Sequence, residues 1–138
     1  MTRRALLFAT AAAGLRADSA DDVWDVLAGM ASALTRGEPA DFLGAIDRAM
    51  PGYERLRASL IALARDYQVE TAIDLVSNEG NDRARTVEAD WLLRLTPLQY
   101  AAETVRRRER VVVKMEKQGK RWKVVSLDPL AVLDPPRV

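Results

Sequence analysis

The hydrophobic pattern of this chain changes its period once, and the change falls at Val69. Upstream, apolar residues recur every three or four positions, which is typical of helices that bury one face. Downstream, apolar and polar residues alternate, which is typical of strands that bury one face. No helical segment separates the predicted strands, which disfavours a parallel sheet. The pattern therefore predicts an α+β fold in which three N-terminal helices pack on a curved antiparallel meander sheet.

Three helices are predicted before the change of period. The first spans about residues 21–36 and stops at Gly37, because glycine suits the residue after a helix end. The second begins at Pro39, and Pro51 ends it and opens the third. The apolar side chains expected to face the core are Val23, Leu27, Met30 and Leu34, then Phe42, Leu43, Ile46 and Met50, then Tyr53, Leu56, Leu60, Leu63, Ala64 and Tyr67.

Four strands are predicted after the change, over about residues 69–76, 83–95, 105–117 and 121–127, with a hairpin loop at 78–82. Odd-numbered residues of the first three strands should face the helices, and the last turn should reverse this parity. Trp91 and Trp122 are therefore both expected in the core. The expected cross-strand pairs are Ile73 with Val87, Asp90 with Arg110, Trp122 with Met115 and Val124 with Val113, and the tail from Pro129 should cross an edge or end of the fold.

The first residues have the pattern of a cleavable export signal. Two adjacent arginines precede a short, alanine-rich apolar run that is too short to serve as a permanent membrane anchor. We expect residues 1–17 to be removed, after Ala13 or Ala17, and residues 18–138 to form one domain in the periplasm or outside the cell. Either the twin-arginine or the general secretory route fits. Because the leader holds three arginines and no acid, its removal lowers the net charge from +1 to −2.

The chain contains no cysteine and no histidine. Disulfides, thiolate nucleophiles and Ser–His or Cys–His catalysis are therefore excluded, together with the commonest metal ligand and general base. Carboxylates, tyrosine, lysine, arginine and hydroxyl groups remain for chemistry. We expect no metal, no cofactor and no catalytic set that the sequence alone can assign.

Three segments, 23–27, 42–53 and 119–129, carry a family resemblance, with Trp24, Phe42 and Trp122 as aromatic landmarks. Together with the element order, they make residues 20–130 resemble the nuclear-transport-factor-2-like superfamily, especially its small exported bacterial members. The resemblance implies a cone of three helices closed by a curved sheet. It implies no settled activity, because the superfamily holds steroid isomerases, polyketide cyclases, dehydratases and epoxide hydrolases beside non-catalytic modules. The histidines of the dehydratases have no counterpart here.

Several polar residues could line a pocket in the cone. Asp47 and Tyr53 could act as a base and a hydroxyl donor if the cavity raised the pKa of the carboxyl group, or they could be structural. Arg107 and Glu109, near the end of the third helix with Tyr67, could form a polar mouth, or they could pair with neighbouring charges. Trp91 is expected to belong to the core rather than to stack on a ligand.

The run of arginines at 106–110 does not predict nucleic-acid binding. In a strand, alternate residues point to opposite faces, so Arg106, Arg108 and Arg110 should point outward, opposite Glu88 and Asp90. Cross-strand ion pairs explain this arrangement, and no aromatic platform for stacking bases accompanies it.

The outward face also presents Val76, Leu92, Val112 and Val125 among its charges. Such a patch is either ordinary exposure or half of an isologous dimer interface, and the resemblance implies a homodimer through this outer sheet face. The predicted function is an exported, non-catalytic binding or assembly module, with a small apolar ligand in its pocket or a partner on its sheet face. The alternative is a metal-free lyase or isomerase that uses a carboxylate and a tyrosine in the cone.

Overall fold

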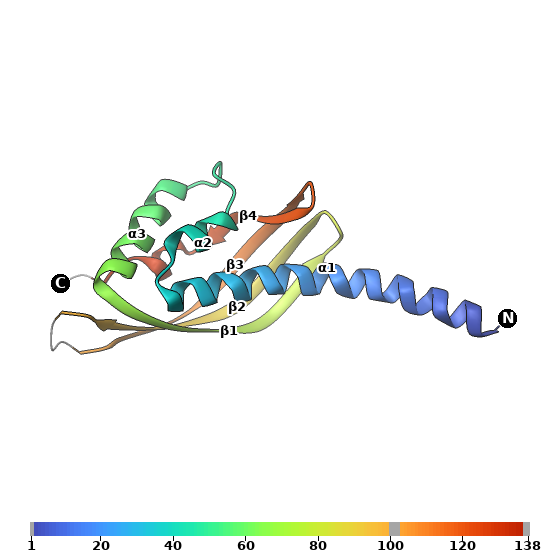
Figure 1. Ribbon diagram of the computed structural model, residues 1–138, viewed down its shortest axis with the longest axis horizontal. Coiled ribbons are helices and arrows are strands. Elements are labelled where there is room, and N and C mark those ends of the chain that lie inside the picture. Colours follow the sequence, from blue (N-terminus) through green and yellow to red (C-terminus); the bar gives the residue numbers. More distant parts are fainter. Residues whose placement is uncertain (1, 100–102, 137–138) are drawn as a thin grey trace.

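The computed structural model describes residues 2–99 and 103–136, and for residues 2–18 it describes only the helical backbone. The strands form one antiparallel sheet in the order β1-β2-β3-β4, and the helices lie on one of its faces (Figure 1). This arrangement confirms the predicted α+β class. The elements are α1 (Thr2–Arg36), α2 (Pro39–Gly44), α3 (Tyr53–Asp66), β1 (Tyr67–Gly80), β2 (Ala84–Pro97), β3 (Val105–Gln118), β4 (Arg121–Asp128) and the 3-10 helix η1 (Leu130–Leu133).

Helix α1 is one continuous helix, and its first part projects beyond the sheet (Figure 1). The sequence predicts its start only near residue 21. The added segment is rich in alanine and leucine, which are strong helix formers, so it continues the same helix. Among the described residues, no helix combines the length and the apolar character needed to cross a membrane.

Helix α2 is shorter than predicted, because it ends at Gly44 instead of reaching Pro51. The chain leaves the helix to pair with β4: the backbone N–H of Asp47 donates to the carbonyl of Val124, and the N–H of Val124 donates to the carbonyl of Ala45. Ile46 consequently forms an isolated parallel bridge with Val124. These tertiary hydrogen bonds override the helical pattern, although Ile46 remains buried as predicted.

The sheet register differs from the prediction in two of its three hairpins. Ile73 pairs with Trp91, not with Val87, because β1 extends four residues beyond its predicted end, to Gly80, and the turn falls at 81–83. Trp122 pairs with Lys117, and Val124 pairs with Met115, a shift of two residues. Both shifts are even numbers, so Ile73, Trp122 and Val124 keep their predicted faces. Bulges at Val76 and Val125 reverse the alternation beyond them, so Asn78 pairs with the buried Val87 and Leu127 with the buried Val113. The pair Asp90–Arg110 is confirmed.

The core lies between the concave side of the sheet and the helices. Trp91 and Trp122 are both buried there, which confirms the faces predicted for these two residues. The predicted course of the tail is also confirmed, because η1 buries Val132 and Leu133 against α3 and β3 at the end of the sheet. Arg55 of α3 holds this tail through an ion pair of 2.7 Å with Asp134.

Candidate functional site

The interior of the cone is filled by its own side chains. Trp91 is only 1% exposed, its ring centroid lies 6.4 Å from that of Phe42, and Leu60 is buried beside them in the same core. The indole N–H of Trp91 donates to Thr71 Oγ1 at 2.7 Å, so the ring has a partner within the protein. Between α1 and α3, near Leu34 and Leu63, only about 10 Å³ of space remains. That is too little for anything larger than one water molecule.

Asp47 and Tyr53 line the same depression, which is open to solvent and has a volume of about 560 Å³. The carboxylate of Asp47 accepts hydrogen bonds from the backbone N–H of Ala49 at 2.8 Å and from Gln118 Nε2 at 2.7 Å. These two bonds, the first being the larger cause, hold the pKa of Asp47 below its ordinary value. A general base of an isomerase needs the opposite shift. This geometry favours the structural role for Asp47.

Of the residues predicted at a polar mouth, Arg107 and Glu109 lie together and Tyr67 lies apart. The guanidinium of Arg107 donates to the backbone carbonyl groups of Val132, at 2.9 Å, and Asp134. It therefore fixes the C-terminal tail. Glu109 is exposed and shares a surface depression with Arg107, whereas Tyr67 is half-buried at the start of β1, outside that depression.

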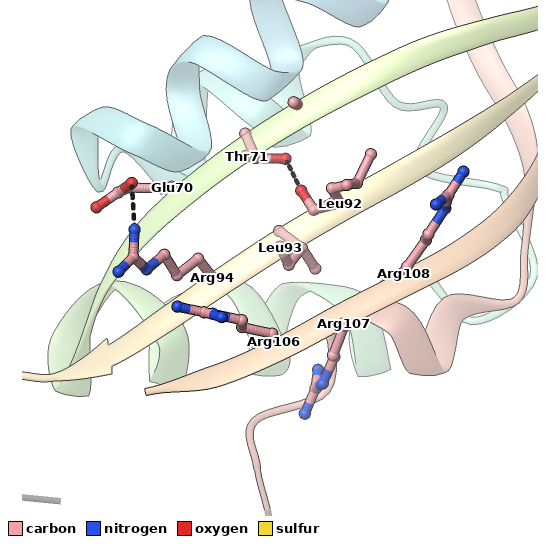
Figure 2. A pocket seen from close by; sticks show the side chains of 9 residues that line it. Glu70, Thr71, Leu92, Leu93, Arg94, Arg106, Arg107 and Arg108 are labelled. Carbon is pink, nitrogen blue, oxygen red and sulfur yellow. Dashed lines mark hydrogen bonds and ion pairs between the residues drawn. The ribbon is translucent and has the colours of Figure 1, made fainter. Parts of the chain in front are cut away.

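A second kind of surface lies on the helix-free face of the sheet. A shallow hollow lies across β1, β2 and β3, where Figure 2 shows the side chains that line it. Its volume is about 430 Å³. Ala72 and Leu92 give it an apolar floor, and the side chains of Arg94, Arg106 and Arg108 surround that floor.

Two of these arginines stand directly opposite each other across neighbouring strands, because the register pairs Arg94 with Arg106. Like charges in this position destabilise a sheet. Arg94 reaches Glu70 at 3.7 Å, whereas Arg106 forms no ion pair within the described part of the chain. This pair was not predicted from the sequence, although the predicted pair Asp90–Arg110 implies it four residues along each strand.

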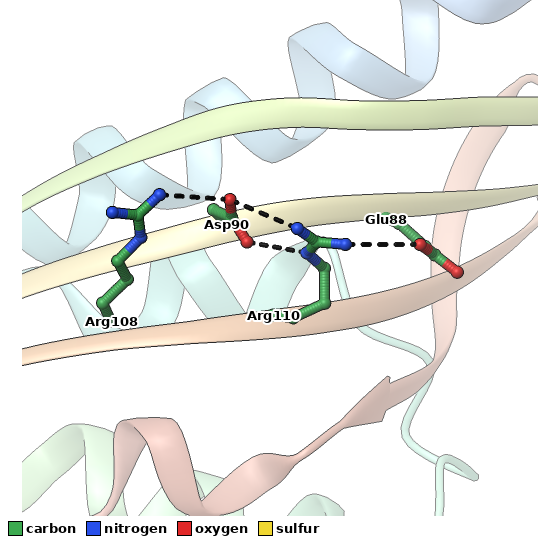
Figure 3. Close-up of polar contacts among 4 residues, drawn as sticks. All are labelled: Glu88, Asp90, Arg108 and Arg110. Carbon is green, nitrogen blue, oxygen red and sulfur yellow. Dashed lines mark hydrogen bonds and ion pairs between the residues drawn. The ribbon is translucent and has the colours of Figure 1, made fainter.

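Beside the hollow, the arginines of β3 form the predicted cross-strand ladder (Figure 3). Asp90 accepts from Arg110 Nε at 2.7 Å and from Arg108 at 3.5 Å, and Arg110 also reaches Glu88 at 4.0 Å. The hydrogen bond from Arg110 is the main cause that lowers the pKa of Asp90. Alternation on the strand thus distributes the arginine run over both faces, as the sequence predicts.

The comparison with known proteins identifies the fold. No family model matches the chain, and no curated protein matches it in sequence. Solved structures do match it. A nuclear-transport-factor-2-like superfamily protein from Salmonella enterica aligns with a TM-score of 0.67 at 10% identity, over 80% of this chain and 89% of that one.

Two further structures carry different functional descriptions. A provisionally assigned aromatic ring hydroxylase from Novosphingobium aromaticivorans matches with a TM-score of 0.69 at 10% identity, over 80% of this chain and 86% of that one. A provisionally assigned calcium/calmodulin-dependent protein kinase II association domain from Xanthomonas campestris matches with a TM-score of 0.64 at 13% identity, over 76% of this chain and 81% of that one. The chain therefore has the nuclear-transport-factor-2-like, or cystatin-like, fold, which confirms the resemblance read from the sequence. At sequence identities this low, structural similarity shows a shared fold and not a shared function.

Proposed function

We propose that this chain is an exported, non-catalytic assembly module that works through the helix-free face of its sheet. One observation carries the proposal: the cone is closed by Trp91 and its neighbours, whereas the opposite face of the sheet is uncovered and hollowed. The association domain among the similar structures is compatible with an assembly role. The alternative, a lyase or isomerase, is less well supported, because it needs a carboxyl group with a raised pKa and the pKa of Asp47 is lowered.

The charges of this face suit a second copy of the same chain. Acids lie along the edge strand β1, and bases lie along β3, with β2 between them. In register, Glu70 shares a row of the sheet with Arg106 through Arg94, and Asp74 shares a row with Arg110 through Asp90. Glu79 and Lys114 share a third row, through Thr86.

A twofold axis parallel to the strands, above β2, would place β1 of one copy over β3 of the other. Each of these acids would then face a base of the partner, and each contact would occur twice, as isologous symmetry requires. Arg106 in particular would gain a carboxylate that it lacks in the monomer. The apolar floor at Ala72 and Leu92 would lie in the same interface.

Sedimentation of the unmodified protein tests this proposal. We expect a dimer at micromolar concentration whose dissociation constant rises severalfold between about 0.05 M and about 0.5 M salt, because salt screens exposed charges. A protein that stays monomeric throughout would refute the proposal. A dimer whose dissociation constant does not change with salt would mean that the interface lies on another surface.

Export is the second part of the proposal, and the N-terminal pattern supports it. The mature protein isolated from its native compartment should begin between residues 14 and 20, as N-terminal sequencing would show. An intact Met1 on material from the cytoplasm would contradict export with cleavage.

A further inference from the structure

The tip of the β1–β2 hairpin binds α1 close to the residues that follow the predicted leader. Ser19 of α1 is only 6% exposed, and its hydroxyl donates to the backbone carbonyl of Asn81 in the hairpin turn at 3.2 Å. The side-chain amide of Asn78 donates to the backbone carbonyl of Ala20 at 3.0 Å. We call these two contacts the hairpin clasp. They join α1 at two successive residues to a part of the chain about sixty positions away.

The hairpin is itself shaped to make these contacts. The bulge at Val76 turns Asn78 toward the helix side of the sheet, and bulges commonly re-aim a side chain in this way. Arg85 then fixes the orientation of Asn78, because its guanidinium donates to Asn78 Oδ1 at 2.8 Å and to the Asn78 carbonyl at 3.1 Å. In the turn, Asn81 Oδ1 accepts from two backbone N–H groups at 2.9 and 3.0 Å. The groups that bind α1 are therefore held in place by hydrogen bonds within the hairpin.

The sequence at the clasp has the composition of a helix start, although α1 continues through it. Serine is favoured at helix N-caps, and Asp21 and Asp22 follow Ser19, where acids suit the positive end of the helix dipole. Within a longer helix these preferences contribute little, because they act only in the first turn. They contribute fully when the helix of the mature protein begins at Ser19.

We infer that the leader is cut after Ala13, and that the clasp marks the point where the protected domain begins. This inference rests on the proposed export and refines it. The third and the first residue before this cut are Ala11 and Ala13, both small as signal cleavage requires, whereas a cut after Ala17 has Leu15 at the third position. A cut after Ala17 would also fall two residues from the buried Ser19. Proteolysis favours chain ends that burial and hydrogen bonds do not tie down.

The course of α1 supports the earlier cut. Before it reaches the hairpin, the helix projects beyond the sheet (Figure 1). Because most helical stability in proteins comes from tertiary packing, a projecting segment unwinds more easily than a packed one. Gly14 lowers the stability of the helix further, directly after the cut. A protease can therefore unwind residues 11–14, whereas at Ser19 it would first have to break the clasp.

N-terminal sequencing of the exported protein tests the position of the cut. We expect Gly14 as its first residue. Ala13→Leu should leave the leader uncut, because a large side chain replaces the small one that cleavage requires, and the control Ala17→Leu should be cut as the unmodified protein is. Any other first residue, such as Asp18, would overturn the inference and leave export standing. An intact Met1 on material from the cytoplasm would overturn both.

Limited proteolysis of the purified full chain tests the clasp. Subtilisin, which accepts most sequences, should cut before Ser19 and not within residues 19–36. In Asn78→Ala, cutting within residues 19–36 should become about tenfold faster, because loss of a buried hydrogen bond raises the population of the opened form. The control Arg83→Ala removes an exposed side chain from the same turn and should leave the rate unchanged.

Ser19→Ala removes only the hydroxyl and replaces Asn78→Ala, with the same expectation, if that variant does not fold. Cuts within residues 19–36 of the unmodified protein, or an unchanged rate in a folded clasp variant, would refute the protective role of the hairpin.

Discussion

Trp91→Ala should lower the free energy of unfolding by about 3–5 kcal/mol, the cost of a large cavity in a packed core. The ring is 1% exposed, contacts the core near Phe42, and donates a hydrogen bond to Thr71. Removing it takes away both the packing and the buried hydrogen bond.

Urea unfolding followed by circular dichroism measures this loss, and Trp24→Ala is the matched control. Trp24 is half-buried and packs on the outside of the same core, so its loss should cost clearly less. A loss below about 1 kcal/mol for Trp91→Ala would place the ring at the surface, because core truncations of this size cost more. The filled cone, on which the proposed function rests, would then be wrong.

Gly52→Ala should cost about 2–3 kcal/mol, the second largest effect that we expect. Gly52 precedes α3 with φ of 82°, a backbone conformation that favours glycine. A Cβ added there would stand 2.4 Å from Leu130 Cδ1, so the side chain of Leu130 would have to shift. The substitution therefore combines backbone strain with overpacking of the tail against the helix.

Gly119→Ala separates these two causes. Gly119 has a similar φ, 65°, but no heavy atom lies within 4 Å of its added Cβ. Only the backbone strain remains, roughly 1 kcal/mol. Equal losses for the two variants in thermal unfolding would mean that contact with η1 contributes nothing at Gly52.

The sequence predicts the layers of this fold because one face of each element is buried. The change of period at Val69 separates helices from strands, and alternation places Trp91 inward. A pair such as Asp90–Arg110 is predictable because opposite charges that face each other across strands stabilise the sheet. The hydrophobic period depends only on residues close together in the sequence, and the charge pair depends only on two neighbouring strands.

The errors concern contacts that no local signal carries. The end of α2 is set by backbone hydrogen bonds of Val124 with Ala45 and Asp47, which are far from it in the sequence. The shift that pairs Ile73 with Trp91 preserves the buried face, so the hydrophobic pattern does not distinguish the two registers.

The candidate site was predictable only in part. The sequence shows that an acid stands at Asp47 and a base at Arg107. Their roles depend on hydrogen bonds to distant groups: Asp47 accepts from Gln118, and Arg107 donates to backbone carbonyls of the tail. The exposed arginines were correctly assigned to the outer face. Their most informative feature, the opposition of Arg94 and Arg106, follows from the register and not from composition.

An exchange of charges between Glu70 and Arg106 tests the central claim most directly, since the proposed dimer places these residues over each other. Glu70→Arg and Arg106→Glu should each raise the dissociation constant of the dimer at least about tenfold, because each brings like charges together.

The double variant should restore the constant to within about threefold of the unmodified protein, since the pair is re-formed with its signs exchanged. Arg57→Glu is the control, because Arg57 is an exposed residue of α3, away from the sheet face, and its dimer should be unchanged. Sedimentation equilibrium measures all four variants under one condition. Recovery in the double variant is the result that the sheet-face assembly predicts, and a double variant no tighter than the two single variants would contradict it.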